Sequence, residues 1–238
     1  MAQENHCIIL AGGLGTRLKS ILPNRPKCLA PIGESTFLEK QILFLMKMGI
    51  THFTLSLGYG HKLVIEEMER LQQRHSLNID CVVETHQLGT GGAIFNAMSA
   101  CALSETLVVN GDTFLDGDLK DMLLPLHPIE DHEELIRIAL VKVEDSARFG
   151  GVNFKNGRIL SFVEKGQSHT PIVSAGMYRL SSKIFDSRVV GSNFSLEMEI
   201  FPEFVCAGSI SGCIINGRFI DIGVPQDYFK FCEMQIPH

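Results

Sequence analysis

The first half of the chain alternates short apolar segments with longer amphipathic ones. Short apolar runs are typical of buried strands, whereas apolar residues that recur every three or four positions are typical of helices. Ser35–Met48 has the helical spacing, with Ser35 or Thr36 as its cap and Gly49 at its end. The expected strands are His6–Leu10, His52–Leu57, Ile79–Glu84 and Thr106–Asn110, and the other expected helices are His61–Arg74, Gly91–Ala102 and Asp118–Leu126.

The pattern changes after Glu134, where strand-like segments follow one another with turns between them. Asn156-Gly157 separates Gly151–Phe154 from Arg158–Val163, which predicts a β-hairpin. A second Asn-Gly turn, Asn216-Gly217, separates Ile210–Ile215 from Arg218–Ile222. The remaining expected elements are strands at Leu135–Val143 and Ile172–Leu180, a helix at Ser195–Val205 capped by Ser195, and a final helix from Pro225 to Gln235.

This order predicts an α/β fold with a mixed, mostly parallel sheet and an antiparallel insertion. Strands that alternate with helices form parallel sheets through right-handed crossovers. We see no linker or repeat, so residues 1–238 are expected to form a single domain. Ligands of such sheets bind beyond the carboxyl ends of the strands, which points to the loops at 11–17, 84–92 and 110–113.

Composition and charge exclude several classes of protein. The 21 Lys and Arg residues against 27 Asp and Glu residues give a net charge of −6, so a nucleic-acid partner is not expected. No apolar run approaches the roughly 20 residues of a membrane span, and the first residues lack the features of a signal peptide, so we expect a cytoplasmic protein without membrane contact. The seven Cys residues have irregular spacing and are expected to be reduced, mostly buried thiols.

The first of the three loops has the composition of a phosphate-binding site. It runs directly after the first expected strand, and three glycines within four residues let several N–H groups point at one anion. Arg17 and Lys27 add cations that suit phosphate oxygens. Neither the G-x-G-x-x-G pattern of Rossmann dehydrogenases nor the Gly-Lys-Ser/Thr of P-loop proteins is present, so those two classes are disfavoured.

This loop resembles the signature of the sugar-1-phosphate nucleotidylyltransferases, and later segments resemble further motifs of that family in the family's order. The similar segments lie between about residues 7 and 230: Ala11–Leu18 with Pro26-Lys27, Glu84–Ala93, Asn110–Asp112, Gly150–Val152, Glu164-Lys165, Ser174–Gly176 and Asp221–Pro225. The resemblance implies a three-layer, Rossmann-like nucleotidyltransferase fold. In it, residues 1–134 mainly bind the nucleotide, and residues 135–238 mainly bind the sugar phosphate and complete the sheet.

In the family reaction, a phosphate oxygen of the sugar 1-phosphate attacks the α-phosphorus of an NTP in line and pyrophosphate leaves. The phosphate nucleophile needs no strong general base, so none of the nine His residues is assigned a catalytic role. The resemblance implies that Arg17, Lys27, Asp112 and Asp221 are catalytic, with Asp112 and Asp221 as ligands of Mg²⁺. The implied nucleotide-binding residues are Leu10, Ala11, Gly12, Gly13, Gly15, Thr16, Arg17, Glu84, Gln87, Gly89, Thr90 and Gly111, and the implied sugar-phosphate-binding residues are Gly151, Glu164, Lys165, Ser174 and Gly176.

Within the family, the chain most resembles guanylyltransferases that make GDP-D-glycero-α-D-manno-heptose for surface polysaccharides. The short length and the segments Asn110–Phe114, Phe194–Glu197 and Phe219–Tyr228 carry this likeness. GTP and the heptose 1-phosphate are therefore the expected substrates. Many relatives have Asn where this chain has Ser174, and the shorter side chain leaves room for a bulkier sugar.

Several alternatives stay open. The same fold could use mannose 1-phosphate with GTP, or another hexose 1-phosphate with UTP, CTP or dTTP. A non-catalytic regulatory homologue is disfavoured because Arg17, Lys27, Asp112 and Asp221 are all present. A glycosyltransferase needs an Asp-x-Asp metal motif, and Asp116-Gly117-Asp118 has that spacing but lies where a helix is expected to begin, with Asp118 as its cap. A homodimer is expected from the enzyme class alone.

Overall fold

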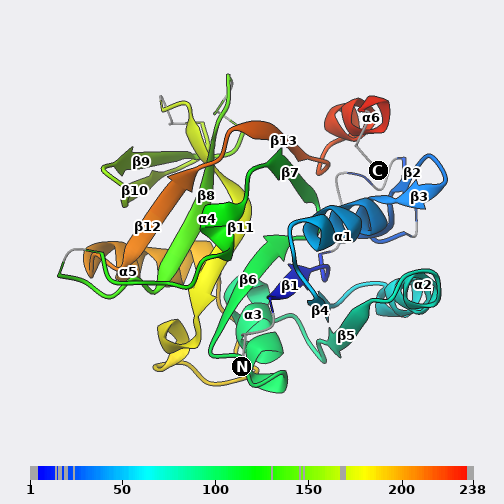
Figure 1. Cartoon of the computed structure of the whole chain (residues 1–238), viewed down its shortest axis with the longest axis horizontal. Coiled ribbons are helices and arrows are strands. Elements are labelled where there is room, and N and C mark those ends of the chain that lie inside the picture. The colour runs from blue at the N-terminus through cyan, green and yellow to red at the C-terminus, as the bar shows by residue number, and fades with distance from the viewer. Residues whose placement is uncertain are drawn as a thin grey trace. The chain divides into compact units, whose positions relative to one another are not determined.

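The computed structural model describes residues 5–13, 15, 18, 21–23, 25–129, 131–144, 146, 148–166 and 170–234 (Figure 1). The chain divides into two compact units. One comprises Met1–Gln87, Val109–Phe114 and Ile220–His238, and the other comprises Leu88–Val108 and Leu115–Phe219. The first unit takes segments from both ends of the chain, whereas the expected nucleotide and sugar halves meet near residue 134, and the single domain stays a prediction. The nucleotide and sugar roles given to the two halves stay predictions.

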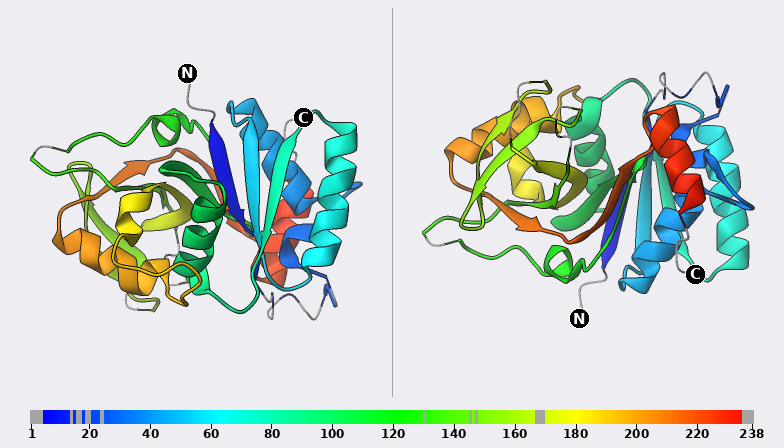
Figure 2. Two further views of the ribbon diagram at one scale, coloured as in Figure 1. Left: turned by 90° about the horizontal axis from the view of Figure 1, so that it is seen from below. Right: turned by 90° about the horizontal axis from the view of Figure 1, so that it is seen from above.

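Parallel strands form the frame of the first unit. β1 (His6–Leu10) pairs in parallel with β4 (His52–Leu57), which pairs in parallel with β5 (Asn78–Val83). The end of β6 (Glu105–Asn110) completes the order β5-β4-β1-β6. Helices α1 (Phe37–Lys47), α2 (His61–Arg74) and α6 (Pro225–Glu233) lie to one side of β4 and β5 (Figure 2). These strands and helices confirm the expected ones within a few residues at each end.

An aromatic cluster in the first unit packs next to the loop that follows β6, which contains Asp112. Phe37 of α1, Phe114 and Phe231 of α6 are almost fully buried, with ring centroids 4.8 to 6.4 Å apart. Leu18, Ala30, Ile32, Ile222 and Tyr228 complete the cluster. Burial of aromatic side chains contributes strongly to core stability. The cluster thereby holds Phe114 and Ile222, which follow shortly after Asp112 and directly after Asp221.

The second unit has the mixed strand arrangement that the sequence predicts, and the α/β class is confirmed. Its strand order is β6-β11-β8-β12-β10-β9, with β8 antiparallel to β11 and parallel to β12. Asn156 and Gly157 have φ angles of 51° and 78°, which are the positive values that a tight hairpin turn between β9 and β10 requires. The strands are β8 (Ile136–Lys142), β9 (Gly151–Lys155), β10 (Arg158–Val163), β11 (Ile172–Ser181) and β12 (Ile210–Ile214), with helices α3 (Gly89–Ala100), α4 (Lys120–Leu123) and α5 (Phe201–Cys206).

The second Asn-Gly pair does not form a hairpin. β12 pairs with β8 and β10, whereas β13 (Gly217–Asp221) pairs with β7 (Thr113–Gly117), a strand that the sequence did not indicate. A Cβ atom on Gly217 would lie 1.9 Å from the carbonyl oxygen of Asp116. Glycine is needed at this position because the two backbones touch, and not because a hairpin turn demands a positive φ.

The expected helices of the second half differ in detail from those observed. The Ser195–Val205 segment begins with a wide π-type turn over Leu196–Ile200, and Ser195 caps it by accepting a hydrogen bond from the Met198 N–H at 3.1 Å. α4 is much shorter than expected, although Asp118 accepts from the Lys120 N–H at 3.1 Å as a cap would. None of the helices in the described part of the chain is long and apolar enough to cross a membrane.

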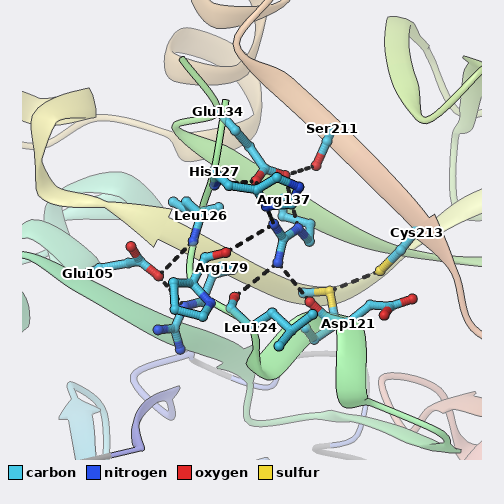
Figure 3. Close-up of polar contacts among 12 residues, drawn as sticks. Glu105, Asp121, Leu124, Leu126, His127, Glu134, Arg137, Arg179, Ser211 and Cys213 are labelled. Carbon is cyan, nitrogen blue, oxygen red and sulfur yellow. Dashed lines mark hydrogen bonds and ion pairs between the residues drawn. The ribbon is translucent and has the colours of Figure 1, made fainter. Parts of the chain in front are cut away.

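A buried ion pair anchors the segment before β8 (Figure 3). Arg137 donates from Nε to Glu134 Oε1 at 2.9 Å and from a terminal nitrogen to the carbonyl oxygens of Asp121 and Leu124 at 2.7 and 3.0 Å. Glu134 also accepts from the Ser211 hydroxyl. Burial of unpaired charges is costly, so this matched set fixes Glu134 and the carbonyl groups of Asp121 and Leu124 against β8 and β12. The structure describes all seven Cys residues and joins no two of them in a disulfide. Only two of them are buried and two are exposed, so the expectation of mostly buried thiols is wrong.

Candidate active site

The glycine-rich loop after β1 packs against the strand ends of the first unit. The Ala11 N–H donates to the Ser56 carbonyl at 2.9 Å, and the Gly12 carbonyl accepts from the Tyr59 N–H at 3.2 Å. A Cβ on Gly12 would lie 3.1 Å from Glu84 Oε1, so the loop passes close to the candidate base-reading residue. Thr16 and Arg17 lie outside the described residues, and their phosphate contacts stay predictions.

Lys27 lies beside the same loop. It begins a short 3₁₀ turn, Lys27–Leu29, that follows Pro26. Gly15 has a φ of +60°, and a Cβ there would lie 2.8 Å from Lys27 Cγ. Glycine at position 15 therefore both permits the left-handed backbone and leaves space for the Lys27 side chain. The glycine-rich motif, at Gly15, and the Pro26-Lys27 motif therefore lie side by side, as predicted.

Lys27 and Asp112 form an ion pair, with 3.0 Å between Nζ and Oδ2. Asp112 lies in the tight turn between β6 and β7. The N–H of Gly111 donates to the Leu10 carbonyl at 2.9 Å, and a Cβ on Gly111 would lie 2.6 Å from that oxygen. Only glycine at position 111 therefore allows the turn to approach the end of β1. Burial, followed by the charge of Asp112, raises the pKa of the neighbouring Cys28 thiol to about 12, which keeps it protonated.

Asp221 is the last residue of β13, and a backbone hydrogen bond from the next residue joins this strand end to Asp112. The Ile222 N–H donates to the Asp112 carbonyl at 2.9 Å. Asp221 Oδ1 accepts from the Gly223 N–H at 2.6 Å. A carboxylate offers about four acceptor sites, so one that accepts a hydrogen bond can also bind a cation.

The donor set of the first unit suits Mg²⁺. No cluster of three or more His, Cys, Asp or Glu residues that could hold a metal occurs among the described residues. Mg²⁺ typically takes one or two carboxylates and keeps waters or substrate phosphates for its other positions. Asp112 and Asp221 therefore fit this ion better than one that needs a complete protein cage.

The segment Gly89–Gly92 packs against another part of the second unit, and its nucleotide contacts stay a prediction. It begins α3, and the N–H groups of Gly91 and Gly92 donate to the Phe194 carbonyl at 3.0 and 3.2 Å. The Thr90 hydroxyl donates to Glu197 Oε2 at 2.6 Å. The close approach that these glycines permit is thus to the chain itself at Ser192–Leu196. Gln87, before this segment, is exposed at the end of the first unit.

The candidate sugar-binding residues lie on or directly after the strands β9, β10 and β11 of the second unit. Gly151 pairs with Val163 across the β9–β10 hairpin, next to Glu164 and Lys165. Ser174 and Gly176 lie at an irregularity of β11, where Gly176 has a φ of +69° and its N–H donates to Ser174 Oγ at 3.3 Å. β-bulges are frequent next to active sites because they redirect side chains. Glycine at 176 is explained by this backbone conformation.

Gln41 is a residue of this site that the sequence analysis missed. Its side-chain amide donates to the carbonyl oxygens of Asn110 and Thr113, on either side of Asp112. A signal was present in the sequence, since Gln41 lies four residues after Phe37 and four before Leu45, within the apolar stripe of the helix. A polar residue in such a stripe indicates a buried polar contact.

Comparison with known proteins agrees with this geometry. The sequence matches the nucleotidyl transferase family over residues 6–235. It is 37% identical over 225 residues to the D-glycero-α-D-manno-heptose 1-phosphate guanylyltransferase of Campylobacter jejuni, covering 94% of this chain and 97% of that protein. It is 31% identical to the mannose-1-phosphate guanylyltransferase catalytic subunit beta of Dictyostelium discoideum, covering 94% of this chain and 62% of that protein.

The fold is similar to that of a solved relative. The crystal structure of HddC from Yersinia pseudotuberculosis matches with a TM-score of 0.83 and 34% identity, covering 96% of this chain and 98% of that one. The same protein has been solved in complex with GMP-PN, and that structure matches with a TM-score of 0.82. From the motifs, the fold and these similarities together, we conclude that the chain belongs to the nucleotidyl transferase family.

Proposed function

We propose that this chain is a sugar-1-phosphate guanylyltransferase that converts GTP and D-glycero-α-D-manno-heptose 1-phosphate into GDP-heptose and pyrophosphate. The observation that carries the proposal is the match to the Campylobacter heptose enzyme over nearly the full length of both chains. The GMP-PN complex of HddC supports a guanine nucleotide as the donor. A role in precursor synthesis for surface polysaccharides follows from the product.

The residues of the first unit suit in-line attack of one polyanion on another. The task of the protein is to position the two phosphates and to neutralise their charge. The Lys27 ammonium has three N–H donors, so it can keep its contact with Asp112 and still donate to the α-phosphate, where charge develops. The N–H groups of Gly12–Thr16 and the Arg17 side chain would hold the β- and γ-phosphates of the leaving group.

Asp112 and Asp221 would hold Mg²⁺. When bound, the ion would neutralise phosphate oxygens and orient the leaving group. The Asp112 carboxylate would also act in a second way, because its ion pair with Lys27 holds the ammonium group beside the glycine-rich loop. Glu84, close to Gly12, is the candidate for reading an edge of the base.

In the second unit, Lys165 would pair with the sugar 1-phosphate and Glu164 would accept hydrogen bonds from sugar hydroxyls. Ser174 has a small side chain, and its Oγ already accepts a hydrogen bond from the Gly176 N–H. A compact residue there favours a sugar larger than a hexose. The similarity to the Dictyostelium mannose enzyme makes GTP with mannose 1-phosphate the second candidate pair.

The test is an assay of pyrophosphate release. The purified protein with Mg²⁺ is given GTP, UTP, CTP or dTTP in every combination with heptose, mannose and glucose 1-phosphates. We expect release with GTP and the heptose phosphate to have a kcat/KM at least tenfold above that of every other pair. Omission of Mg²⁺ and addition of EDTA should abolish release.

Two results would contradict the proposal in different ways. No release with any pair would exclude a transferase. Release with GTP and mannose 1-phosphate, but not with the heptose phosphate, would retain guanylyl transfer and exclude the heptose substrate.

The expected homodimer and the cytoplasmic location are separate predictions, and the dimer is measured by light scattering on the purified protein.

A further inference from the structure

Gln41 is a buried polar residue on the apolar face of α1. Only 4% of its surface is exposed, and Phe37, Leu38, Ile42 and Leu45 are buried on the same helix. A polar side chain in such a position lowers stability unless its hydrogen-bonding groups find partners. The partners of Gln41 therefore indicate why the amide is present.

The Nε2 group of Gln41 holds both sides of the turn that carries Asp112. It donates to the Asn110 carbonyl at 2.9 Å and to the Thr113 carbonyl at 2.7 Å. An amide nitrogen has two N–H donors, so both bonds form at once. The two residues between these carbonyls are Gly111 and Asp112.

The same turn is fixed from two other segments of the first unit. The Gly111 N–H donates to the Leu10 carbonyl at the end of β1, and the Asp112 carbonyl accepts from the Ile222 N–H, both at 2.9 Å. Gln41 completes this set from α1. Each of the four residues from 110 to 113 thus has a backbone group held by another element.

The remaining polar atom of Gln41, Oε1, has no partner within the described part of the chain. Oε1 is buried and accepts no hydrogen bond from any described residue. An unsatisfied buried acceptor costs free energy, and an apolar residue of the same shape would avoid that cost. Among the described residues, the two donated bonds are therefore the contacts that favour an amide at this position.

We propose that Gln41 is a positioning residue that holds the Asp112 carboxylate in place beside Lys27. This inference rests on the proposed function, in which Asp112 and Lys27 act on the phosphates. Without the two bonds, the Asn110 and Thr113 carbonyls lose their common donor and the turn can relax. Asp112 would then depart from the position in which its Oδ2 lies 3.0 Å from Lys27 Nζ.

The variants Q41M and Q41E test this role, with I42A as the matched control. Q41M keeps the length of the side chain and removes both donors, while Q41E places a carboxylate against two carbonyl oxygens. Ile42 is fully buried in the same helix but is apolar, so I42A lowers stability without removing a hydrogen bond to the turn. All variants are assayed below their melting temperatures, with circular dichroism as the measure of folding.

We expect Q41M to lower kcat at least tenfold and Q41E to lower it further, with KM for GTP changed less than threefold. The Mg²⁺ concentration for half-maximal activity should rise in both. I42A should keep kcat within twofold of the wild type despite its lower melting temperature. If Q41M behaves as I42A does, the amide has a structural role only and the positioning role is excluded.

A crystal structure of Q41M separates this inference from the proposed function. We expect its 110–113 turn to shift and its Lys27 Nζ to Asp112 Oδ2 separation to exceed the wild-type 3.0 Å. This distance does not depend on any substrate. An unchanged turn would overturn the inference even if the enzyme is a guanylyltransferase, and a shifted turn would support it even if the wild type proves inactive.

Discussion

At the scale of single residues, the chemistry of the candidate site depends on Lys27 and Asp112. Their side chains are 15% and 32% exposed, so the ion pair is partly shielded from water and open enough to meet a ligand. A cation and a carboxylate in such an environment interact more strongly than they would on the surface. The surface pair Lys120–Asp118, with exposures of 84% and 66%, provides a comparison.

We expect K27M and D112N each to lower kcat by about 10²- to 10³-fold, because each removes a group that stabilises charge on the transferring phosphate. The double variant should be little worse than the poorer single one, since the two residues act as a unit. The measurement is steady-state pyrophosphate release, and K120M is the control, with kcat within twofold of the wild type. A K27M enzyme that keeps more than half of the wild-type kcat would show that Lys27 does not act on the substrate.

Motifs made Lys27 and Asp112 predictable from the sequence. The contacts that hold these residues in place could not be predicted. Asp112 and Lys27 belong to segments whose residue types and order match a family. Gln41 belongs to no motif, and its partners are backbone carbonyls that any sequence would provide at 110 and 113. The same holds for Arg137, whose hydrogen bonds to the carbonyls of Asp121 and Leu124 depend on the path of the chain. Sequence patterns identify side chains of unusual type, but contacts to the backbone appear only with the fold.

At the scale of elements, α3 shows how tertiary packing overrides local preference. The helix begins with three glycines among its first four residues, although glycine is an unfavourable helix residue. The structure explains them, since a Cβ on Gly91 would lie 2.5 Å from ring atoms of Phe194, and one on Gly92 would lie 2.3 Å from the Ser192 carbonyl oxygen. These glycines let the start of α3 pack directly on the chain before the π-type turn.

The variant G91A separates the two effects. Helix propensity alone predicts that it stabilises the protein by about 1 kcal/mol. The structure predicts the opposite sign, a loss of about 1–3 kcal/mol, because the new methyl group must displace the Phe194 ring. That ring also contacts Phe185 and the Arg188 guanidinium, which limit its movement.

Urea unfolding gives the free energy for G91A and for the control S99A. Ser99 is exposed near the other end of α3, so S99A should change the free energy of unfolding by less than about 0.5 kcal/mol. Stabilisation of G91A relative to the wild type would mean that the start of α3 is loose enough to accept a side chain.

Strand pairing was the least predictable feature at this scale. The Asn156-Gly157 turn was correctly predicted because turn chemistry is local, and both residues adopt positive φ angles. The strands on either side of Asn216-Gly217 were also predicted, but their pairing was not: β13 pairs with β7, about a hundred residues earlier in the chain, and not with its neighbour β12. A pairing partner so far away leaves no signal in the turn itself.

At the scale of the whole molecule, the stability of the fold should depend on pH through His6 at the start of β1. Burial, followed by the nearby His52, lowers the His6 pKa from 6.5 to about 4, while the charge of Asp80 acts weakly in the opposite direction. The His6 ring stacks on His52, with 4.3 Å between centroids, and its Nε2 lies 2.7 Å from Thr54 Oγ1. At neutral pH the ring is uncharged in both the folded and the unfolded chain.

As the pH falls from about 6.5 to about 4, the unfolded chain binds a proton at His6 that the folded chain does not. The free energy of unfolding therefore falls through this window, by up to about 3 kcal/mol from this residue.

In the variant H6Q, an amide can still bond to Thr54 but cannot titrate. Its stability should decline less steeply with falling pH, so the difference between wild type and H6Q should shift in favour of H6Q. Urea unfolding at intervals from pH 7.5 to pH 4.5 measures both curves, and an NMR titration of the His6 ring measures its pKa directly. Parallel curves, or a ring that titrates near 6.5, would show that the start of β1 accepts a charge and that the acid sensitivity of the fold lies elsewhere.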